Sequence, residues 1–174
     1  MCGIVSILSN NKVIDNLINC LKQLQNRGYD SAGLCTLDSE SLHYLKYAST
    51  DEIDSIKKLE NEINSITDAN IGIAHTRWAT HGGKTDINSH PHLSTNNKIA
   101  IVHNGIIENF QEIKSMLIEK GCSFKSQTDT EVISNLLEYN YCGNFIECIR
   151  KTIKMLEGTY GLSILNLDEP NKLY

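Results

Sequence analysis

The chain opens with MCGIVSIL, residues 1–8. The apolar residues after Cys2 predict a short buried strand that begins at the second residue. Removal of Met1 makes Cys2 the terminal residue, which then carries a thiol and an α-amine. A terminal α-amine has a pKa of about 7.7–8.0 and can activate a neighbouring nucleophile. Position alone also fits a buried small hydrophobic residue, so the rest of the chain must decide the role of Cys2.

Strand and helix patterns alternate along the chain beyond this first strand. Helices are expected over residues 13–25, 50–66, 106–120, 128–139 and 144–158. Strands are expected over residues 31–37, 41–48, 71–75, 98–103, 122–126, 159–167 and 172–174. Hairpins and strand–helix successions occur together, which predicts an α+β class with a largely antiparallel sheet component. The last strand stops after three residues, so we expect a C-terminal truncation.

Three local signals refine this pattern. Thr128 with Glu131, and Asn144 with Glu147, have the spacing of capping boxes that begin helices. Residues 76–97 show no period, and structureless loops of this length are often lids or binding loops.

The bulk composition excludes several classes of protein. At 174 residues, with a net charge of −5 and a pI near 5.6, the chain fits one globular domain with no affinity for nucleic acid or membranes. No apolar run reaches membrane-spanning length, and no secretory signal is visible. The six cysteines are scattered, with no CxxC pair, which argues against a disulfide scaffold. We therefore expect a cytoplasmic protein.

Five motifs follow Cys2 in order: RGYDSAG (27–33), HTRWATHG (75–82), HPH (90–92), HNGIIEN (103–109) and TDTE (128–131). Together they closely resemble the glutaminase domain of glutamine–fructose-6-phosphate transaminases (glucosamine-6-phosphate synthases). These are class II glutamine amidotransferases of the N-terminal-nucleophile hydrolase superfamily. The resemblance extends from Cys2 to about Leu167. Related amidotransferases share the terminal Cys-Gly and an Asn-Gly, but RGYDSAG with HTRWATHG resembles the hexosamine-forming branch.

The resemblance implies a four-layer α/β/β/α sandwich of the N-terminal-nucleophile hydrolase type, C-terminally truncated. Residues 1–174 would form one glutamine amidotransferase type 2 domain, incomplete at its C-terminus and without the sugar-isomerase domains. The implied reaction hydrolyses L-glutamine to L-glutamate and ammonia through a thioester on Cys2. In complete family members the ammonia converts fructose 6-phosphate to glucosamine 6-phosphate, which feeds hexosamine and UDP-N-acetylglucosamine biosynthesis.

The resemblance also assigns the catalytic residues Cys2, Asn104 and Gly105. Attack on the glutamine carboxamide creates a tetrahedral oxyanion, which the Asn104 side-chain amide and the Gly105 backbone N–H would stabilise. Asn-Gly is also the commonest tight hairpin turn. Here a helical pattern follows it, which favours a strand-to-helix corner with exposed donors.

Two charged residues would bind the two ends of glutamine. The planar guanidinium of Arg77 can bond both oxygens of the α-carboxylate. Asp129 would balance the α-ammonium, although the helix dipole alone also favours an acid in a first helical turn.

Four further residues complete the implied substrate site. Thr80 and His81 lie in the loop that the family closes over glutamine, and Trp78 would pack over the site and exclude water. Arg27 matches a family residue near the terminal cysteine, although a solvated arginine at a helix end is also ordinary.

The loop histidines are candidate metal ligands by residue type. His81, His90 and His92 share one polar loop, but no cysteine or carboxylate is in register with them, so they would make a poor zinc site. We expect no metal and no cofactor. His75 and His103 close strand patterns, which predicts hydrogen-bonded structural residues.

The expected partners are L-glutamine and either sugar-isomerase domains or a separate ammonia acceptor, and homo-oligomerisation is left open. Three hypotheses follow for the chain as it stands. It is a piece of a whole synthase, a stand-alone glutaminase subunit, or a catalytically silent glutamine-binding or assembly module.

Overall fold

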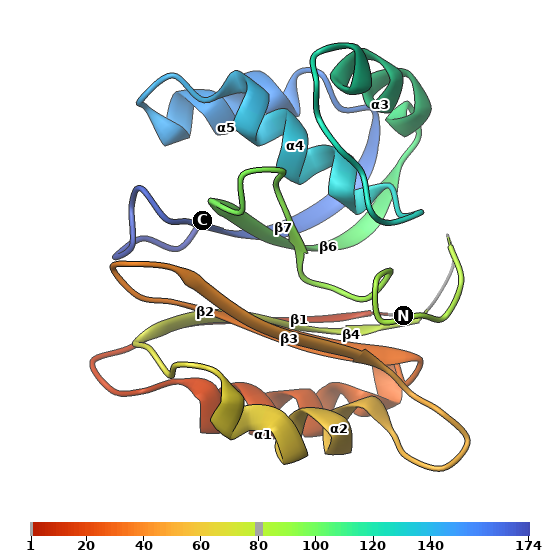
Figure 1. Cartoon of the computed structure of the whole chain (residues 1–174), viewed down its shortest axis with the longest axis vertical. Coiled ribbons are helices and arrows are strands. Elements are labelled where there is room, and N and C mark those ends of the chain that lie inside the picture. The colour runs from red at the N-terminus through yellow and green to blue at the C-terminus, as the bar shows by residue number, and fades with distance from the viewer. Residues whose placement is uncertain (1, 79–81) are drawn as a thin grey trace.

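The computed structural model describes residues 2–78 and 82–174. Two antiparallel sheets lie face to face, and helices cover the outer side of each (Figure 1). The layers therefore run helix, sheet, sheet, helix, which confirms the α+β class and the four-layer α/β/β/α sandwich expected from the sequence.

The first sheet has four strands in the order β1-β4-β2-β3. Its strands are β1 (Gly3–Leu8), β4 (Ile71–Arg77), β2 (Ser31–Leu37) and β3 (Leu42–Ala48). Helices α1 (Ile14–Leu24) and α2 (Ser55–Glu62) cover its outer face, each followed by a 3-10 turn, Gln25–Arg27 and Ile63–Ser65. Leucines and isoleucines of the two helices pack on Ala32, Leu34 and Ala74 of the sheet.

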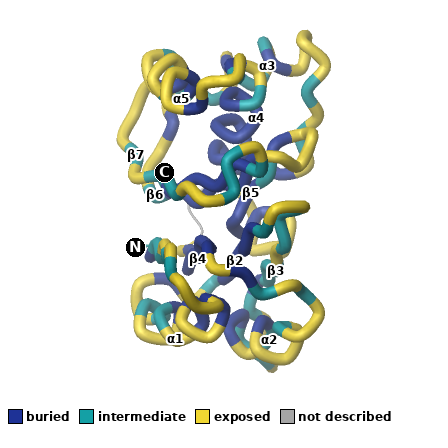
Figure 2. Tube along the Cα trace, turned by 90° about the vertical axis from the view of Figure 1, so that its left-hand side faces the viewer, coloured by how far each residue is buried: buried dark blue, intermediate teal, exposed yellow. Residues whose placement is uncertain are grey.

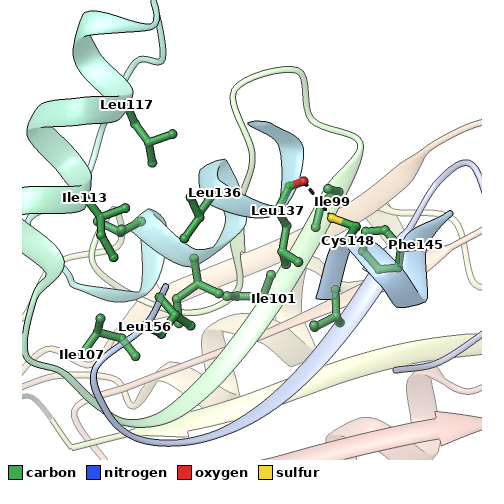
Figure 3. Packing of buried hydrophobic residues seen from close by; sticks show 13 residues of the cluster. Ile99, Ile101, Ile107, Ile113, Leu117, Leu136, Leu137, Phe145, Cys148 and Leu156 are labelled. Carbon is green, nitrogen blue, oxygen red and sulfur yellow. Dashed lines mark hydrogen bonds between the residues drawn. The ribbon is translucent and has the colours of Figure 1, made fainter. Parts of the chain in front are cut away.

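The second sheet has three strands in the order β5-β6-β7. Its strands are β5 (His92–Leu93), β6 (Ile99–Ile107) and β7 (Gly158–Asn166). Helices α3 (Phe110–Glu119), α4 (Thr130–Asn140) and α5 (Phe145–Ile153) cover it. Figure 3 shows Leu136 and Leu137 of α4 among Ile99, Ile101 and Phe145 in the core beneath these helices.

A third apolar cluster lies between the two sheets. Cys35, Ile73, Ala100, Val102 and Leu165 are fully buried there. Figure 2 shows that burial follows the strands and α4, whereas α1, α2 and α5 present exposed outer faces. With the clusters beneath the helices, the hydrophobic contacts that hold the four layers together are distributed over all three interfaces.

None of the helices in the described part of the chain is long and apolar enough to cross a membrane.

The expected corner at Asn104-Gly105 is wrong, because β6 runs straight through both residues. Asn104 pairs with Gly161 and Gly105 with Tyr160 of β7. Gly105 has φ +138°, and a Cβ there would collide with the Thr159 carbonyl oxygen. Pairing with a distant strand thus overrides the local turn preference, and glycine makes the close approach possible.

Several element boundaries also differ from expectation. The structure has no strand over residues 122–126, whereas β5 forms inside the segment expected to be irregular. The helices expected over residues 50–66, 106–120 and 144–158 are shorter, because α2 begins at Ser55, α3 at Phe110, and α5 ends at Ile153. The structure also has no strand over residues 172–174, although Tyr174 exchanges two backbone hydrogen bonds with Ile164.

One of the two expected capping boxes forms only in part, and the other does not form. Asn144 accepts from the Glu147 backbone N–H at 3.2 Å, as expected, but the Glu147 carboxylate bonds Arg150. Thr128 instead bonds His92, and the Glu131 carboxylate accepts from Ser126. The polar groups of residues 126–131 are used for tertiary contacts in place of a helix cap.

Gly33 provides a test of the tight packing between β2 and the loop before β5. A Cβ at this position would overlap the His90 carbonyl oxygen. We expect Gly33→Ala to lower the free energy of unfolding by about 1–3 kcal/mol, because the loop must move away. The measurement is urea unfolding followed by circular dichroism.

Gly161→Ala is the matched control in a strand of the other sheet. The nearest atom to its added Cβ would be the Asn104 carbonyl oxygen at 4.0 Å. Its unfolding free energy should stay within about 0.5 kcal/mol of wild type. Equal stability of the two variants would contradict the packing argument.

Candidate active site

Cys2 lies where β1 begins, beside the end of β4. The register pairs Gly3 with Thr76, so Cys2 lies at the same end of the sheet as Arg77, the last residue of β4. The Trp78 backbone N–H donates to Cys2 Sγ at 3.3 Å, and the thiol lies 3.7 Å from the Trp78 carbonyl oxygen. The side chain is half-buried, so a reagent can reach the sulfur.

A small cavity of about 40 Å³ opens beside Cys2. It brings together the ends of β1, β4 and β6 and the beginning of α4. Its lining residues are Cys2, Arg77, Trp78, His90, His103, Gly105, Thr128, Asp129 and Thr130. A larger cavity of about 230 Å³ lies elsewhere, with His92 and Lys46 in its wall, and contains neither Cys2 nor Arg77.

The structure brings Asn104 and Gly105 to Cys2 through the free edge of β6. Asn104 Nδ2 donates to the Cys2 carbonyl oxygen at 3.2 Å. Backbone groups alternate between the two edges of a strand. Asn104 pairs toward β7, so the Gly105 N–H points to the opposite edge, where β5 reaches only as far as Ile101.

Two hydrogen bonds fix the direction of that edge. The His103 carbonyl oxygen, two residues before Gly105, accepts from His75 at 3.1 Å. The Ile107 N–H, two residues after it, donates to the Asp129 carboxylate at 2.8 Å. The Gly105 N–H lies between them on the same edge and faces the cavity that it lines.

Arg77 and Asp129 are buried charges in the same cavity wall, exposed by only 4% and 6%. Burial lowers the pKa of Arg77 from its usual value, while nearby Cys2, Asp30 and Asp129 oppose that shift. Arg77 Nη1 also donates to the Gly83 carbonyl oxygen at 3.4 Å. A buried cation and a buried anion on one small cavity suit a zwitterionic ligand.

The remaining predicted site residues lie at the rim of the cavity, outside its lining, or outside the described part of the chain. Trp78 is 44% exposed and its ring meets Tyr29 edge-on at 5.3 Å, so it forms the rim of the cavity. Arg27 is exposed and is not among the lining residues, so its role stays a prediction. Thr80 and His81, like Met1, lie outside the described residues.

Three contacting histidine rings lie beside the site, and one of them, His90, lines the cavity. The ring centroids of His75 and His90 are 4.1 Å apart, and those of His90 and His92 are 4.9 Å apart. His75 bonds Asn104 Oδ1 at 2.8 Å, and His103 Nδ1 bonds Thr130 Oγ1 at 2.9 Å. His75 and His103 are thus hydrogen-bonded structural residues, as expected.

Sequence reasoning missed two residues that organise this part of the site. Thr130 Oγ1 is shared by His103 and His90, whose Nε2 lies 3.0 Å away. Lys46 donates to the carbonyl oxygens of Ile87, Ser89 and Pro91 at 3.2, 2.9 and 3.1 Å. The TDTE motif contained Thr130, but no local pattern marks a strand lysine as a loop clamp.

The comparisons with known proteins agree with this geometry. A family model described as "Glutamine amidotransferase domain" matches residues 75–174. The chain is 45% identical over 173 residues to the glutamine–fructose-6-phosphate aminotransferase (isomerizing) of Clostridium perfringens. It is 46% identical over 177 residues to the protein of the same name from Thermococcus kodakarensis.

These alignments cover 99% and 100% of the chain but only 28% and 29% of the relatives. The chain therefore spans less than a third of the length of these curated relatives. Among solved structures, a glutamine phosphoribosylpyrophosphate amidotransferase from B. subtilis matches with a TM-score of 0.79 at 26% identity. That match covers 96% of this chain and 35% of the other, and it supports the N-terminal-nucleophile hydrolase type of the sandwich.

The buried histidines predict a loss of stability in mild acid. Burial lowers the pKa of His75 to about 4, and it lowers the pKa of His90 and His92 well below the usual 6.5. The unfolded chain therefore binds protons first as the pH falls. Stability is fully present above pH 6.5 and is lost as the pH falls toward 4.

His75 alone should lower the free energy of unfolding by about 2 kcal/mol between pH 6.5 and pH 5. Urea unfolding at several pH values measures this slope. Backbone N–H groups of Glu40 and Ser41 hold the pKa of Asp38 at about 2, so its contribution is lost only at lower pH. A flat unfolding free energy between pH 6.5 and 5 would contradict neutral burial of the histidines.

Proposed function

The chain belongs to the glutamine amidotransferase domain family, and from this we propose that it hydrolyses L-glutamine to L-glutamate and ammonia through a thioester on Cys2. One observation carries the proposal: a half-buried thiol and two opposite buried charges line one cavity, and two candidate oxyanion donors lie beside the residue that carries the thiol. The charges are Arg77 and Asp129, and the donors are on Asn104 and Gly105. Each group matches one part of the glutamine molecule or of its transition state.

Acylation would begin once Met1 has been removed. The free α-amine of Cys2 accepts the thiol proton, and the thiolate attacks the side-chain carbonyl carbon of glutamine. Negative charge then develops on the carbonyl oxygen. Asn104 Nδ2, already directed at the Cys2 backbone, and the Gly105 N–H stabilise that charge as fixed donors.

Collapse of the tetrahedral intermediate breaks the carbon–nitrogen bond. The proton held by the α-amine goes to the leaving nitrogen, and ammonia departs from a γ-glutamyl thioester. Water, deprotonated by the same amine, then attacks the thioester carbonyl. The Cys2 thiol leaves, takes back its proton, and glutamate is released.

The two charged residues would hold the amino-acid end of the substrate. Arg77 pairs with the α-carboxylate and Asp129 with the α-ammonium. Because both are held in place by backbone groups, Gly83 for Arg77 and Ile107 for Asp129, they are preorganised for this contact. Trp78 at the rim, together with Thr80 and His81, would complete the enclosure, and Arg27 would support the terminal cysteine.

We assign residues 1–174 to one glutamine amidotransferase type 2 domain. The relatives are named for an aminotransferase reaction on fructose 6-phosphate and are more than three times as long. We propose that ammonia reaches fructose 6-phosphate on sugar-isomerase domains of a longer protein, or on a separate acceptor. All six cysteines are free, which supports a reducing cytoplasm as the compartment.

Covalent trapping tests the nucleophile. Protein with a verified Cys2 terminus is treated with 6-diazo-5-oxo-L-norleucine, an electrophilic glutamine analogue, and its intact mass and peptide map are recorded. We expect one adduct on Cys2 and loss of glutamate release. Cys2→Ser should take no adduct and release no glutamate.

Cys142→Ser is the matched control, because Cys142 is an exposed thiol that does not line the cavity. It should label and turn over like wild type. Labelling elsewhere than Cys2 would overturn the assignment. Glutamine binding by calorimetry without any turnover would favour the silent-module hypothesis.

Asp129→Asn separates substrate binding from structure. Asparagine keeps an oxygen that can accept from the Ile107 N–H but loses the charge. We expect the KM for glutamine to rise about 10- to 100-fold with a smaller change in kcat, since a hydrogen bond to a charged group contributes about 1.5–3 kcal/mol.

The matched ligand is glutaric acid monoamide, which lacks the α-ammonium group. Wild type should discriminate strongly between glutamine and this analogue, and Asp129→Asn should discriminate weakly. Retention of the full wild-type preference by Asp129→Asn would exclude this residue as the ammonium partner.

A further inference from the structure

His75 lies behind Asn104 and has no contact with the cavity lined by Cys2. It occupies β4, opposite Ile4 of β1, and is only 1% exposed. Its Nε2 lies 3.1 Å from the His103 carbonyl oxygen and 2.8 Å from Asn104 Oδ1. The residue therefore touches the candidate oxyanion donor from the side opposite the nucleophile.

The His103 carbonyl decides the tautomer of His75. A carbonyl oxygen can only accept, so His75 Nε2 must carry the proton. The other ring nitrogen, Nδ1, is buried and has no hydrogen-bond partner among the described residues. An unprotonated Nδ1 is consistent with a neutral ring, and burial lowers the pKa of His75 to about 4.

The tautomer in turn decides which way the Asn104 amide faces. An Nε2–H donor requires an acceptor, so the atom of Asn104 beside it must be the amide oxygen and not the nitrogen. Nδ2 is then directed toward Cys2, where it donates to the backbone carbonyl at 3.2 Å. One carbonyl oxygen on β6 thereby fixes the direction of two side chains.

This direction matters for the chemistry because the oxygen of an asparagine amide carries a negative partial charge, whereas its NH2 group carries a positive one. Rotation by 180° would replace a donor with the Oδ1 oxygen, which repels a developing oxyanion. A donor that is already oriented stabilises the transition state without reorganisation. The stack with His90, at 4.1 Å between ring centroids, helps to hold the His75 ring in place.

We propose that His75 is a positioning residue that locks the Asn104 side-chain amide with its nitrogen facing the oxyanion formed on Cys2. The inference rests on the proposed glutaminase function and adds a residue to it. It involves no contact between His75 and substrate, so its effect is on the rate of acylation and not on glutamine binding.

The experiment compares His75→Phe with His75→Gln in steady-state glutamine hydrolysis. Phenylalanine keeps a ring in the stack but removes the donor, whereas glutamine places an amide N–H near the position of Nε2. We expect kcat to fall about 10- to 100-fold for His75→Phe with KM within two-fold, and to recover at least in part for His75→Gln. In an Asn104→Ala background, His75→Phe should cause no further loss.

Alkylation of Cys2 by iodoacetamide, followed by peptide mass, separates positioning from general damage. That displacement forms no oxyanion, so its rate should be the same in wild type and His75→Phe. The matched variant Ser163→Ala removes a buried hydrogen bond between the two sheets, the one to Ser6 at 2.7 Å, but leaves Asn104 and the cavity lining unchanged, and its kcat should stay within three-fold of wild type. Equal kcat losses for the two variants, additive losses with Asn104→Ala, or slowed alkylation would overturn the inference.

A second readout does not depend on turnover. Nitrogen-15 NMR of the histidine rings should show His75 protonated at Nε2 and unprotonated at Nδ1. The opposite tautomer would overturn the inference even in active enzyme. Absence of glutaminase activity in wild type, with the expected tautomer present, would instead count against the proposed function.

Discussion

Asn104, on β6 of the second sheet, holds the candidate site together through two hydrogen bonds to the first sheet. Its amide oxygen accepts from His75 on β4, and its amide nitrogen donates to the Cys2 carbonyl oxygen. Much of the remaining interface between the two sheets is apolar packing, which is tolerant of small shifts. These directional bonds fix the relative position of β1, β4 and β6 at the one end where the nucleophile lies.

The interface between the sheets changes character along its length. Fully buried residues such as Ile73 and Val102 fill one part of it. The Ser6 and Ser163 hydroxyls bond each other across it at 2.7 Å, and the stacked histidines lie at the Cys2 end. Burial of polar groups costs desolvation free energy unless the groups are hydrogen-bonded, and this cost arises at the Cys2 end of the interface but not at the apolar end. Neutral histidines limit that cost because they are buried without charge.

The sequence predicted most of the elements, and the order of the motifs predicted the layered fold. Periodic apolar residues located α1, β2 and β7 within a residue or two of their ends. Local patterns failed where a distant partner decides the conformation. The Asn104-Gly105 pair has the composition of a turn but extends along β7, and β5 exists only because it pairs with β6.

The residues of the candidate site likewise fall into those that the sequence could predict and those that it could not. Roles for Cys2, Arg77 and Asp129 could be predicted from motifs, because each carries a chemical group that matches part of glutamine. Thr130 and Lys46 could not, since their roles are to bond histidines and loop carbonyls that are adjacent only in the folded chain. Residues that organise a site through other residues leave no chemical signature in a single sequence.

The error at Asn104-Gly105 also explains how one strand can supply so many groups to the site. A turn would aim its donors in unrelated directions, whereas a strand places every second backbone group on the same edge. Because β5 is only two residues long, that edge of β6 is left open beyond Ile101. The His103 carbonyl then orients His75, the Ile107 N–H holds Asp129, and the Gly105 N–H between them faces the cavity. The short partner strand is therefore a condition for the proposed oxyanion donor, because a longer β5 would bond the Gly105 N–H and remove it from the candidate site.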